Sequence, residues 1–175
     1  MSSEKPTNTS NVLAEGLSHI DEAGAARMVN VGEKPIARRT ATATVVCRML
    51  PQTAEKIRQN TLKKGDVLSV ARLAAIQAAK RTDELIPLCH SLPLDGVEVH
   101  FQWLSNERLK ISVTVNVTAR TGVEMEAMVG ASIAGLTVYD MCKAVDRSMS
   151  LEEVSLESKT GGTRGDYRRG ASTEQ

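Results

Sequence analysis

The sequence predicts an α+β fold in which helices cover one face of an antiparallel sheet. Three observations predict it: alternating apolar residues typical of strands, long apolar segments typical of packed helices, and the order in which they follow one another. That order is strand, helix, strand, strand, helix, strand, which is the split-βαβ, ferredoxin-like arrangement. A chain of 175 residues is long enough to give this fold one substantial core.

Four segments have the composition of strands. Residues 38–49 are rich in Thr and Val, and residues 97–103 and 109–117 place their large apolar residues at every second position. The short polar segment between the last two predicts an antiparallel hairpin. Residues 152–159 alternate weakly and predict a last strand. The other face of the hairpin is polar, and we expect it to be solvated or packed against another element.

The helices have recognisable starts. Residues 51–60 predict a short helix that begins at a proline, and Asp66 is suited to cap a helix that reaches about residue 81. Residues 121–145 predict a long, mostly apolar helix. Small residues line one stretch of it, where we expect a second element to approach closely: Gly130, Ala131, Ala134 and Gly135.

Composition restricts the domain plan and the function. We expect residues 1–18 to be a disordered N-terminal segment, residues 19–160 a single α+β domain, and residues 161–175 a flexible glycine-rich and charged tail. A net charge of +1 and 2% aromatic residues argue against a general nucleic-acid binder. No apolar run approaches the ~20 residues of a membrane helix.

The three cysteines have no CxxC spacing, so the sequence predicts neither a disulfide framework nor a zinc motif. A reducing, cytoplasmic location is expected.

Four charged residues lie in the long apolar helix, which makes it the most informative segment of the chain. Glu124 and Glu126 lie near its start, and Asp140 and Lys143 near its end. Buried charges are costly unless they are paired or used, so the helix is either a structural ion-pair element or one wall of an active site. Asp140 and Lys143 form an ordinary i,i+3 ion pair if exposed, and a tuned acid–base pair if partly buried.

The rise of a helix separates the two ends. Fourteen residues at ~1.5 Å each place Glu126 and Asp140 about 21 Å apart along a continuous helix, on nearly the same side. One small substrate cannot contact both from one chain. Either two subunits share the site or the helix breaks at a glycine, and we favour the shared site.

Three further segments are candidates for binding. Prolines stiffen the loop of residues 85–94 around Cys89 and His90, which suits substrate binding or proton transfer. A Cys/His nucleophilic pair and a histidine bonded to backbone are the alternatives there. Lys63 and Lys64 precede a helix start, where a phosphate is favoured. Residues 159–165 have cations between glycines. They form either a loop that closes over a triphosphate or a solvated tail.

Several separate motifs in order resemble the cyclic pyranopterin monophosphate synthase family of molybdenum cofactor biosynthesis, the protein C family of that pathway. They are KKGDVLSVARLAAIQAAKRT, DELIPLCHSLPL, TGVEMEAM, YDMCKAV and SKTGGTRGDY, together with the N-terminal SHIDEAGAARMVNVGEKPIARRTATA. The resemblance covers roughly residues 18–167. One departure is Asn30, where the family often has aspartate.

The resemblance implies a fold, an assembly and a reaction. The fold is the ferredoxin-like α+β protomer, and the assembly is a homohexamer, a trimer of dimers with sites at dimer interfaces. The reaction is that of a lyase converting 3′,8-cyclo-7,8-dihydro-GTP to cyclic pyranopterin monophosphate and pyrophosphate. The implied catalytic residues are Asp140, Lys143 and Lys64. The implied substrate-binding residues are Leu88, Cys89, His90, Glu124, Met125, Glu126 and Lys159.

Two other function classes compete with this one. A non-catalytic assembly or ligand-binding module of the same fold would pair the polar helix residues only with protein groups. A metal hydrolase is disfavoured because the three histidines, at 19, 90 and 100, lie in no ligand motif. We expect no resident metal or cofactor, and a magnesium ion that accompanies the triphosphate stays compatible with the sequence.

Overall fold

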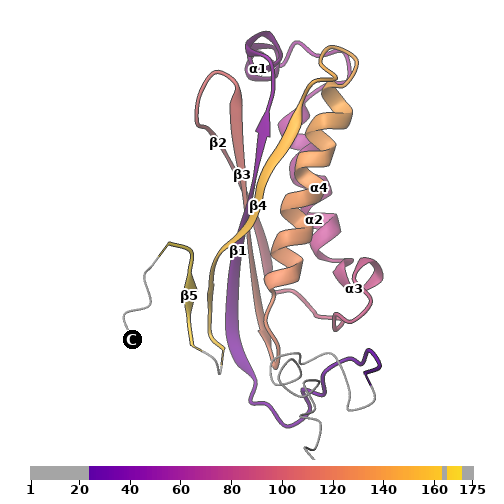
Figure 1. The fold of residues 1–175 in the computed structure, drawn as a ribbon, viewed down its shortest axis with the longest axis vertical. Helices are drawn as coiled ribbons and strands as arrows, with labels where there is room; N and C mark the ends of the chain where they lie inside the picture. The colour runs from indigo at the N-terminus through magenta and orange to yellow at the C-terminus, as the bar shows by residue number, and fades with distance from the viewer. Residues whose placement is uncertain (1–23, 163–164, 171–175) are drawn as a thin grey trace, which may run out of the picture.

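The computed structural model describes residues 24–162 and 165–170, and it confirms the ferredoxin-like α+β fold. Its elements are β1 (Ala37–Arg48), α1 (Pro51–Arg58), α2 (Val67–Ala79), α3 (Thr82–Leu85), β2 (Gly96–Trp103), β3 (Arg108–Ala119), α4 (Glu124–Cys142), β4 (Ser150–Thr160) and β5 (Tyr167–Arg168). The strands form one antiparallel sheet in the order β2-β3-β1-β4-β5. The long helices α2 and α4 lie together on one face of it (Figure 1).

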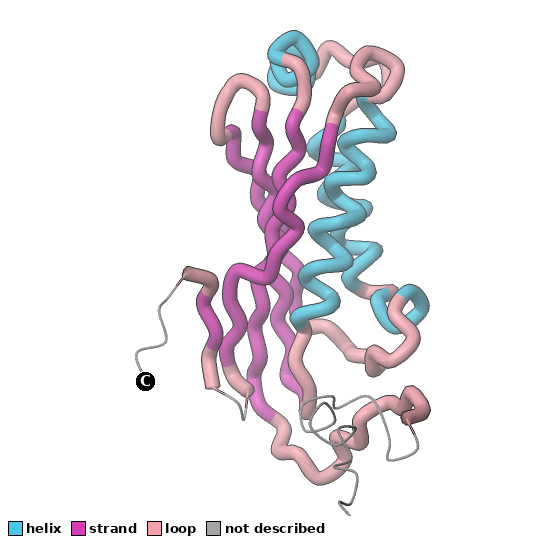
Figure 2. The backbone as a smooth tube through the Cα atoms, in the orientation of Figure 1, coloured by secondary structure: helices cyan, strands magenta, loops and turns pink. Residues whose placement is uncertain are grey.

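The central strand β1 organises the sheet. It pairs with β3 along its whole length, from Ala37 opposite Ala119 to Arg48 opposite Arg108, and with β4 on its other side with two register shifts. The alternating apolar residues of β1 and β3 face the helices and are buried, as the period of two predicts. Figure 2 shows how closely these strands follow one another beside the helix layer.

The small residues of α4 let it pack closely within its own chain. A side chain at Gly130 would meet Val113 of β3 and the backbone oxygen of Ala75 on α2, and one at Gly135 would meet Val45 of β1. The predicted close approach is therefore confirmed. Its partners are α2 and the sheet of the same protomer, so this surface does not lie open to a second subunit. The helix continues through both glycines.

Some boundaries differ from the prediction. The long helix spans residues 124–142 instead of 121–145, because Lys143 already acts as its C-terminal cap. The sequence missed the four-residue α3, and it missed β5, whose two residues pair with Ser158 and Lys159 of β4. The predicted disordered segment, residues 1–18, lies outside the described residues, as does part of the predicted tail.

The outer face of the sheet is polar, as predicted. Glu98, His100 and Gln102 of β2 are exposed there. Hydroxyl groups pair across β1 and β3, with Thr42 Oγ1 2.9 Å from Thr114 Oγ1. Within residues 24–162 and 165–170, no helix has the length and apolar character needed to cross a membrane.

Candidate functional site

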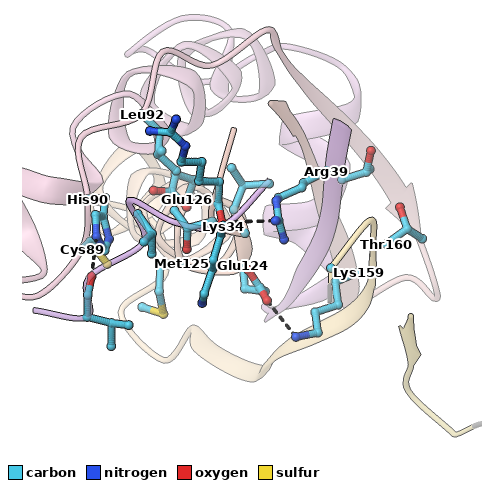
Figure 3. A pocket seen from close by; sticks show the side chains of 18 of the residues that line it. Lys34, Arg39, Cys89, His90, Leu92, Glu124, Met125, Glu126, Lys159 and Thr160 are labelled. Carbon is cyan, nitrogen blue, oxygen red and sulfur yellow. Dashed lines mark hydrogen bonds and ion pairs between the residues drawn. The ribbon is translucent and has the colours of Figure 1, made fainter. Parts of the chain in front are cut away.

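A cavity of about 320 Å³ opens where α4 begins and β4 ends. Residues from the N-terminal segment, β1, the loop after α3, the turn before α4 and the end of β4 line it (Figure 3). The fold brings together here all seven residues predicted to bind substrate: Leu88, Cys89, His90, Glu124, Met125, Glu126 and Lys159. They come from three separate parts of the sequence, so the chain's topology creates this pocket.

Glu126 is the buried carboxyl of the pocket, with 4% of its surface exposed. Burial raises its pKa to about 7, a backbone hydrogen bond opposes the shift, and the charges of Glu124 and Asp83 add to it. The carboxyl therefore holds a proton into the neutral range, where it can donate a hydrogen bond to a ligand.

Glu124, two residues before Glu126, differs from it because it has a cationic partner. Lys159 Nζ donates to Glu124 Oε1 at 3.0 Å, and this bond ties the end of β4 to the first residue of α4 (Figure 3). Both side chains are about one-third exposed and line the cavity. The pair places an ammonium and a carboxylate side by side at the pocket wall.

His90 and Cys89 enter the pocket from the loop after α3. His90 Nε2 lies 2.9 Å from the backbone oxygen of Val29, so the histidine does bond to backbone, as one alternative predicted. Burial raises the pKa of the Cys89 thiol, and the charges of Glu126 and Asp83 raise it further. A neutral thiol is a poor nucleophile, which argues against the Cys/His nucleophilic pair.

The residue that departs from the family pattern, Asn30, is part of the same N-terminal segment. Its Oδ1 accepts a hydrogen bond of 2.8 Å from the backbone N–H of Gly32. An aspartate carboxylate would accept the same bond, so the departure preserves the local turn.

Three cations of the pocket escaped the sequence reasoning: Lys34, Arg39 and Arg120. A signal existed for Arg39, because it occupies a core-facing position in the row of Ala41, Ala43 and Val45. The guanidinium is buried, and it donates from Nε to the oxygen of Ala119 at 3.0 Å and from Nη2 to that of Arg120 at 3.1 Å. It thereby fixes the turn that leads into α4.

The three predicted catalytic residues form a second cluster. Asp140 Oδ1 lies 2.6 Å from Lys143 Nζ, and Asp140 Oδ2 lies 3.1 Å from Lys64 Nζ, which also donates to the backbone oxygen of Asp140 at 2.8 Å. The hydrogen bond from Lys143, then that from Lys64, lowers the pKa of Asp140, and the bond to Asp140 raises the pKa of Lys143. Asp140 and Lys143 are therefore both charged at neutral pH.

Of the two alternatives for this pair, the protomer shows the exposed i,i+3 ion pair. The side chains of Asp140 and Lys143 are 57% and 52% exposed. Their apolar neighbours Val138, Met141 and Cys142 are buried, but they face the sheet, while Asp140 points away from it. The protomer therefore presents this cluster to the outside, where a second molecule can reach it.

The cavity and the cluster lie at opposite ends of α4. The helix is continuous from Glu124 to Cys142, so the fourteen residues between Glu126 and Asp140 span about 21 Å. The structure thus gathers the predicted binding residues in one place and the predicted catalytic residues in another.

Residues 28–162 match the MoaC family, which is most of the chain and nearly all of its described part. The chain belongs to the MoaC family. The match begins in the N-terminal segment beside the cavity and ends at Gly162, a residue of the cavity wall. It includes every predicted binding and catalytic residue, so both ends of α4 lie within the matched region.

Several relatives are named cyclic pyranopterin monophosphate synthases. The chain is 48% identical over 158 residues to cyclic pyranopterin monophosphate synthase from Brevibacillus brevis, which covers 90% of this chain and 99% of the relative. It is 52% identical over 159 residues to cyclic pyranopterin monophosphate synthase 1 from Mycobacterium tuberculosis, covering 91% and 94%. It is 51% identical over 153 residues to the synthase from Herpetosiphon aurantiacus, covering 87% and 93%.

No group of three or more His, Cys, Asp or Glu in the described part of the chain is placed to hold a metal ion. The cationic wall of the cavity, with Lys34, Arg39, Arg120 and Lys159, suits an anionic ligand instead. The prediction that no metal or cofactor is resident stays a prediction.

Proposed function

We propose that the chain is a lyase of molybdenum cofactor biosynthesis, which converts 3′,8-cyclo-7,8-dihydro-GTP to cyclic pyranopterin monophosphate with release of pyrophosphate. The observation that carries this function is the near-complete match to synthases of that name at about half identity. The cavity is compatible with it, since it combines cations for phosphates with carboxyl groups for a heterocyclic base.

The base end of the substrate would meet the acidic wall of the cavity. A protonated Glu126 donates a hydrogen bond to a carbonyl oxygen or ring nitrogen, while Glu124, paired with Lys159, accepts from N–H groups. His90 contributes a ring nitrogen from the stiff loop. Lys159 would meet the phosphates, together with the cations that line the cavity near it. Such charge neutralisation stabilises pyrophosphate as it leaves.

Asp140, Lys143 and Lys64 would perform the proton transfers. A ribose hydroxyl must lose a proton when it attacks the phosphate, and the ring must gain and lose protons as the pyranopterin forms. The Asp140 carboxylate would accept a proton and the lysine side chains beside it would donate one, which requires the substrate to separate the ion pairs that lower the pKa of Asp140 and raise that of Lys143. Each lysine also stabilises negative charge that develops close to it.

We propose that the protein assembles as a homohexamer, a trimer of dimers in which each active site lies at a dimer interface. The separation of about 21 Å between the two clusters supports it, because one chain cannot bring both to a small substrate. The exposure of the Asp140 cluster fits contact with a partner. Light scattering after size-exclusion chromatography tests the proposal, and a monomeric mass for active protein would contradict it. A cytoplasmic location is part of the proposal, supported by three unpaired cysteines.

The test of the function is release of pyrophosphate from 3′,8-cyclo-7,8-dihydro-GTP by the purified protein. Asp140→Asn and Lys143→Ala should each reduce the turnover rate by at least about a hundredfold. Glu55→Gln is a matched control, because Glu55 also forms an exposed i,i+3 ion pair, 3.6 Å from Arg58 on α1. Folding of each variant is checked by its thermal transition.

Two outcomes would count against the proposal. If the wild-type protein binds the substrate but releases no pyrophosphate, the chain is a binding module and not a lyase. If both Asp140→Asn and Lys143→Ala turn over at the wild-type rate, the cluster has no catalytic role.

A further inference from the structure

The short helix α3 holds an acidic residue, Asp83, directly behind the wall of the cavity. The Ser91 hydroxyl donates a hydrogen bond to Asp83 Oδ2, and Ser91 follows His90 in the chain. This bond ties the loop that carries Cys89 and His90 back to α3. Asp83 thus acts on the cavity from outside it, through the loop.

The position of α3 is itself fixed by a buried hydroxyl. Thr82, the first residue of α3, is 1% exposed, and its Oγ1 donates to the backbone oxygens at the end of α2, at 3.1 Å to Ala79 and 3.3 Å to Ala78. The next residue, Asp83, cannot move far while that anchor holds. A fixed carboxylate is a suitable support for a binding loop.

We propose that Asp83 is a positioning residue of the site, which holds the Cys89–His90 loop through its bond to Ser91 and adds a negative charge to the surroundings of Glu126. The proposal rests on the proposed function, because it states how one wall of that site is prepared for its ligand.

The charges around Glu126 explain why Asp83 matters. Burial is the main cause of the raised pKa of Glu126, and Glu124 and Asp83 are the charged residues that add to it. Asp83 also raises the pKa of Cys89, after burial and Glu126. The titratable and cationic groups that line the same cavity from the other elements are Cys89, His90, Lys34, Arg39, Arg120 and Lys159.

Two of those cations already have partners within the protein. Lys159 is paired with Glu124, and Arg39 bonds to two backbone oxygens. These two cations are engaged with other groups, so they do little to oppose the effect of the Asp83 charge on Glu126. The ligand that fits a protonated Glu126 is a neutral heterocycle with a hydrogen-bond acceptor, such as the carbonyl of a purine-like base.

Two substitutions separate the two roles of Asp83. Asp83→Asn keeps an oxygen that can accept from Ser91 but removes the charge, so the pKa of Glu126 should fall. The KM for substrate should then begin to rise at a lower pH than in the wild-type protein. Ser91→Ala keeps the charge of Asp83 but removes its hydrogen bond to the loop. KM should then rise by the same factor at every pH, so the pH at which KM begins to increase should not change. Glu84→Gln is the matched control, because it removes the same charge from the next, exposed residue of α3.

The protonation of Glu126 is measured without turnover, by the infrared band of its protonated carboxyl, which Glu126→Gln removes. A pH titration of this band that is the same in Asp83→Asn and Glu84→Gln would overturn the electrostatic role. An unchanged KM in Ser91→Ala would overturn the positioning role, even if Asp83→Asn fails to fold. A protein that releases no pyrophosphate refutes the proposed function alone, since the infrared titration still decides whether Asp83 controls Glu126.

Discussion

Glu126 makes a quantitative prediction about stability and pH. Its ordinary pKa is 4.5 and its pKa in the folded chain is about 7. Between these values the folded state keeps a proton that the unfolded state has lost, so the free energy of unfolding falls as pH rises. The stabilisation from this proton is complete below pH 4.5 and is lost as pH passes through about 7.

The size of the effect follows from the two pKa values. A difference of one pKa unit corresponds to about 1.4 kcal/mol, so the span from 4.5 to about 7 corresponds to about 3 kcal/mol. Glu126→Gln keeps the shape of the protonated carboxyl and cannot ionise. Relative to the wild-type protein, the variant should therefore become more stable by about 3 kcal/mol as pH rises across this range.

Urea unfolding at fixed protein concentration measures this difference from pH 4.5 to pH 8. Other carboxylates, such as Asp140 and Asp146, have lowered pKa values, but they titrate alike in both proteins and cancel in the comparison. Glu55→Gln is the control, because it removes an exposed carboxyl and shows what the same chemical change does at the surface. If Glu126→Gln behaves like this control, Glu126 is ionised in the folded protein and the reasoning is refuted.

Two further predictions concern stability and the shape of the pocket. Asp146 is 3% exposed and accepts hydrogen bonds from the backbone N–H of Leu50 at 2.8 Å and from Ser148, so Asp146→Ala should lower the free energy of unfolding by about 1–3 kcal/mol in urea at pH 7. An unchanged urea midpoint would show that these bonds are replaced by water. Gly161 has a φ of 82°, and a Cβ there would lie 2.0 Å from the backbone oxygen of Arg38. Gly161→Ala should therefore displace the end of the cavity wall at Gly162 and raise KM. Gly165→Ala, at a φ of 77° with nothing within 4 Å, controls for backbone strain alone, and equal KM values in the two variants would contradict the steric account.

The fold was predictable because its core repeats a simple pattern. The core-facing residues of β1 and β3 alternate along both strands, and that period determines which face meets the helices. The four residues of α3 are too few for a period to show, and β5 exists only through its pairing with β4. The small residues of α4 predicted a close contact, but a pattern within one helix does not say which element makes it.

The site was predictable in its residues and less so in its environment. Motif resemblance identified Glu126, whereas its burial depends on the tertiary structure around the start of α4, which no sequence pattern shows. Arg39 is a charged residue among the apolar, core-facing positions of β1, and such a residue indicates a specific partner. Its partners are backbone oxygens, which no sequence pattern identifies. The sequence left open whether Asp140 is exposed or partly buried, because the spacing of the ion pair is the same in both cases, and the structure shows it exposed.

The separation of the two clusters predicts that two defective variants restore each other. Lys159→Ala alters the cavity and Asp140→Asn alters the exposed cluster, and each alone should lose most activity. In a two-fold dimer each site takes its cavity from one chain and its cluster from the other. A mixed dimer then has one site with both defects and one site with neither.

Random exchange of the two variants makes about half of the dimers mixed, so about a quarter of all sites should be intact. Mixing is achieved by joint refolding, and the rate of pyrophosphate release is compared with that of an equal amount of wild-type protein. If the cavity and the cluster serve one site within a single chain, no mixture contains an intact site and the rate stays at the sum of the two variants. Recovery toward a quarter would therefore require a site shared between subunits, whereas no recovery would require α4 to bend within one protomer.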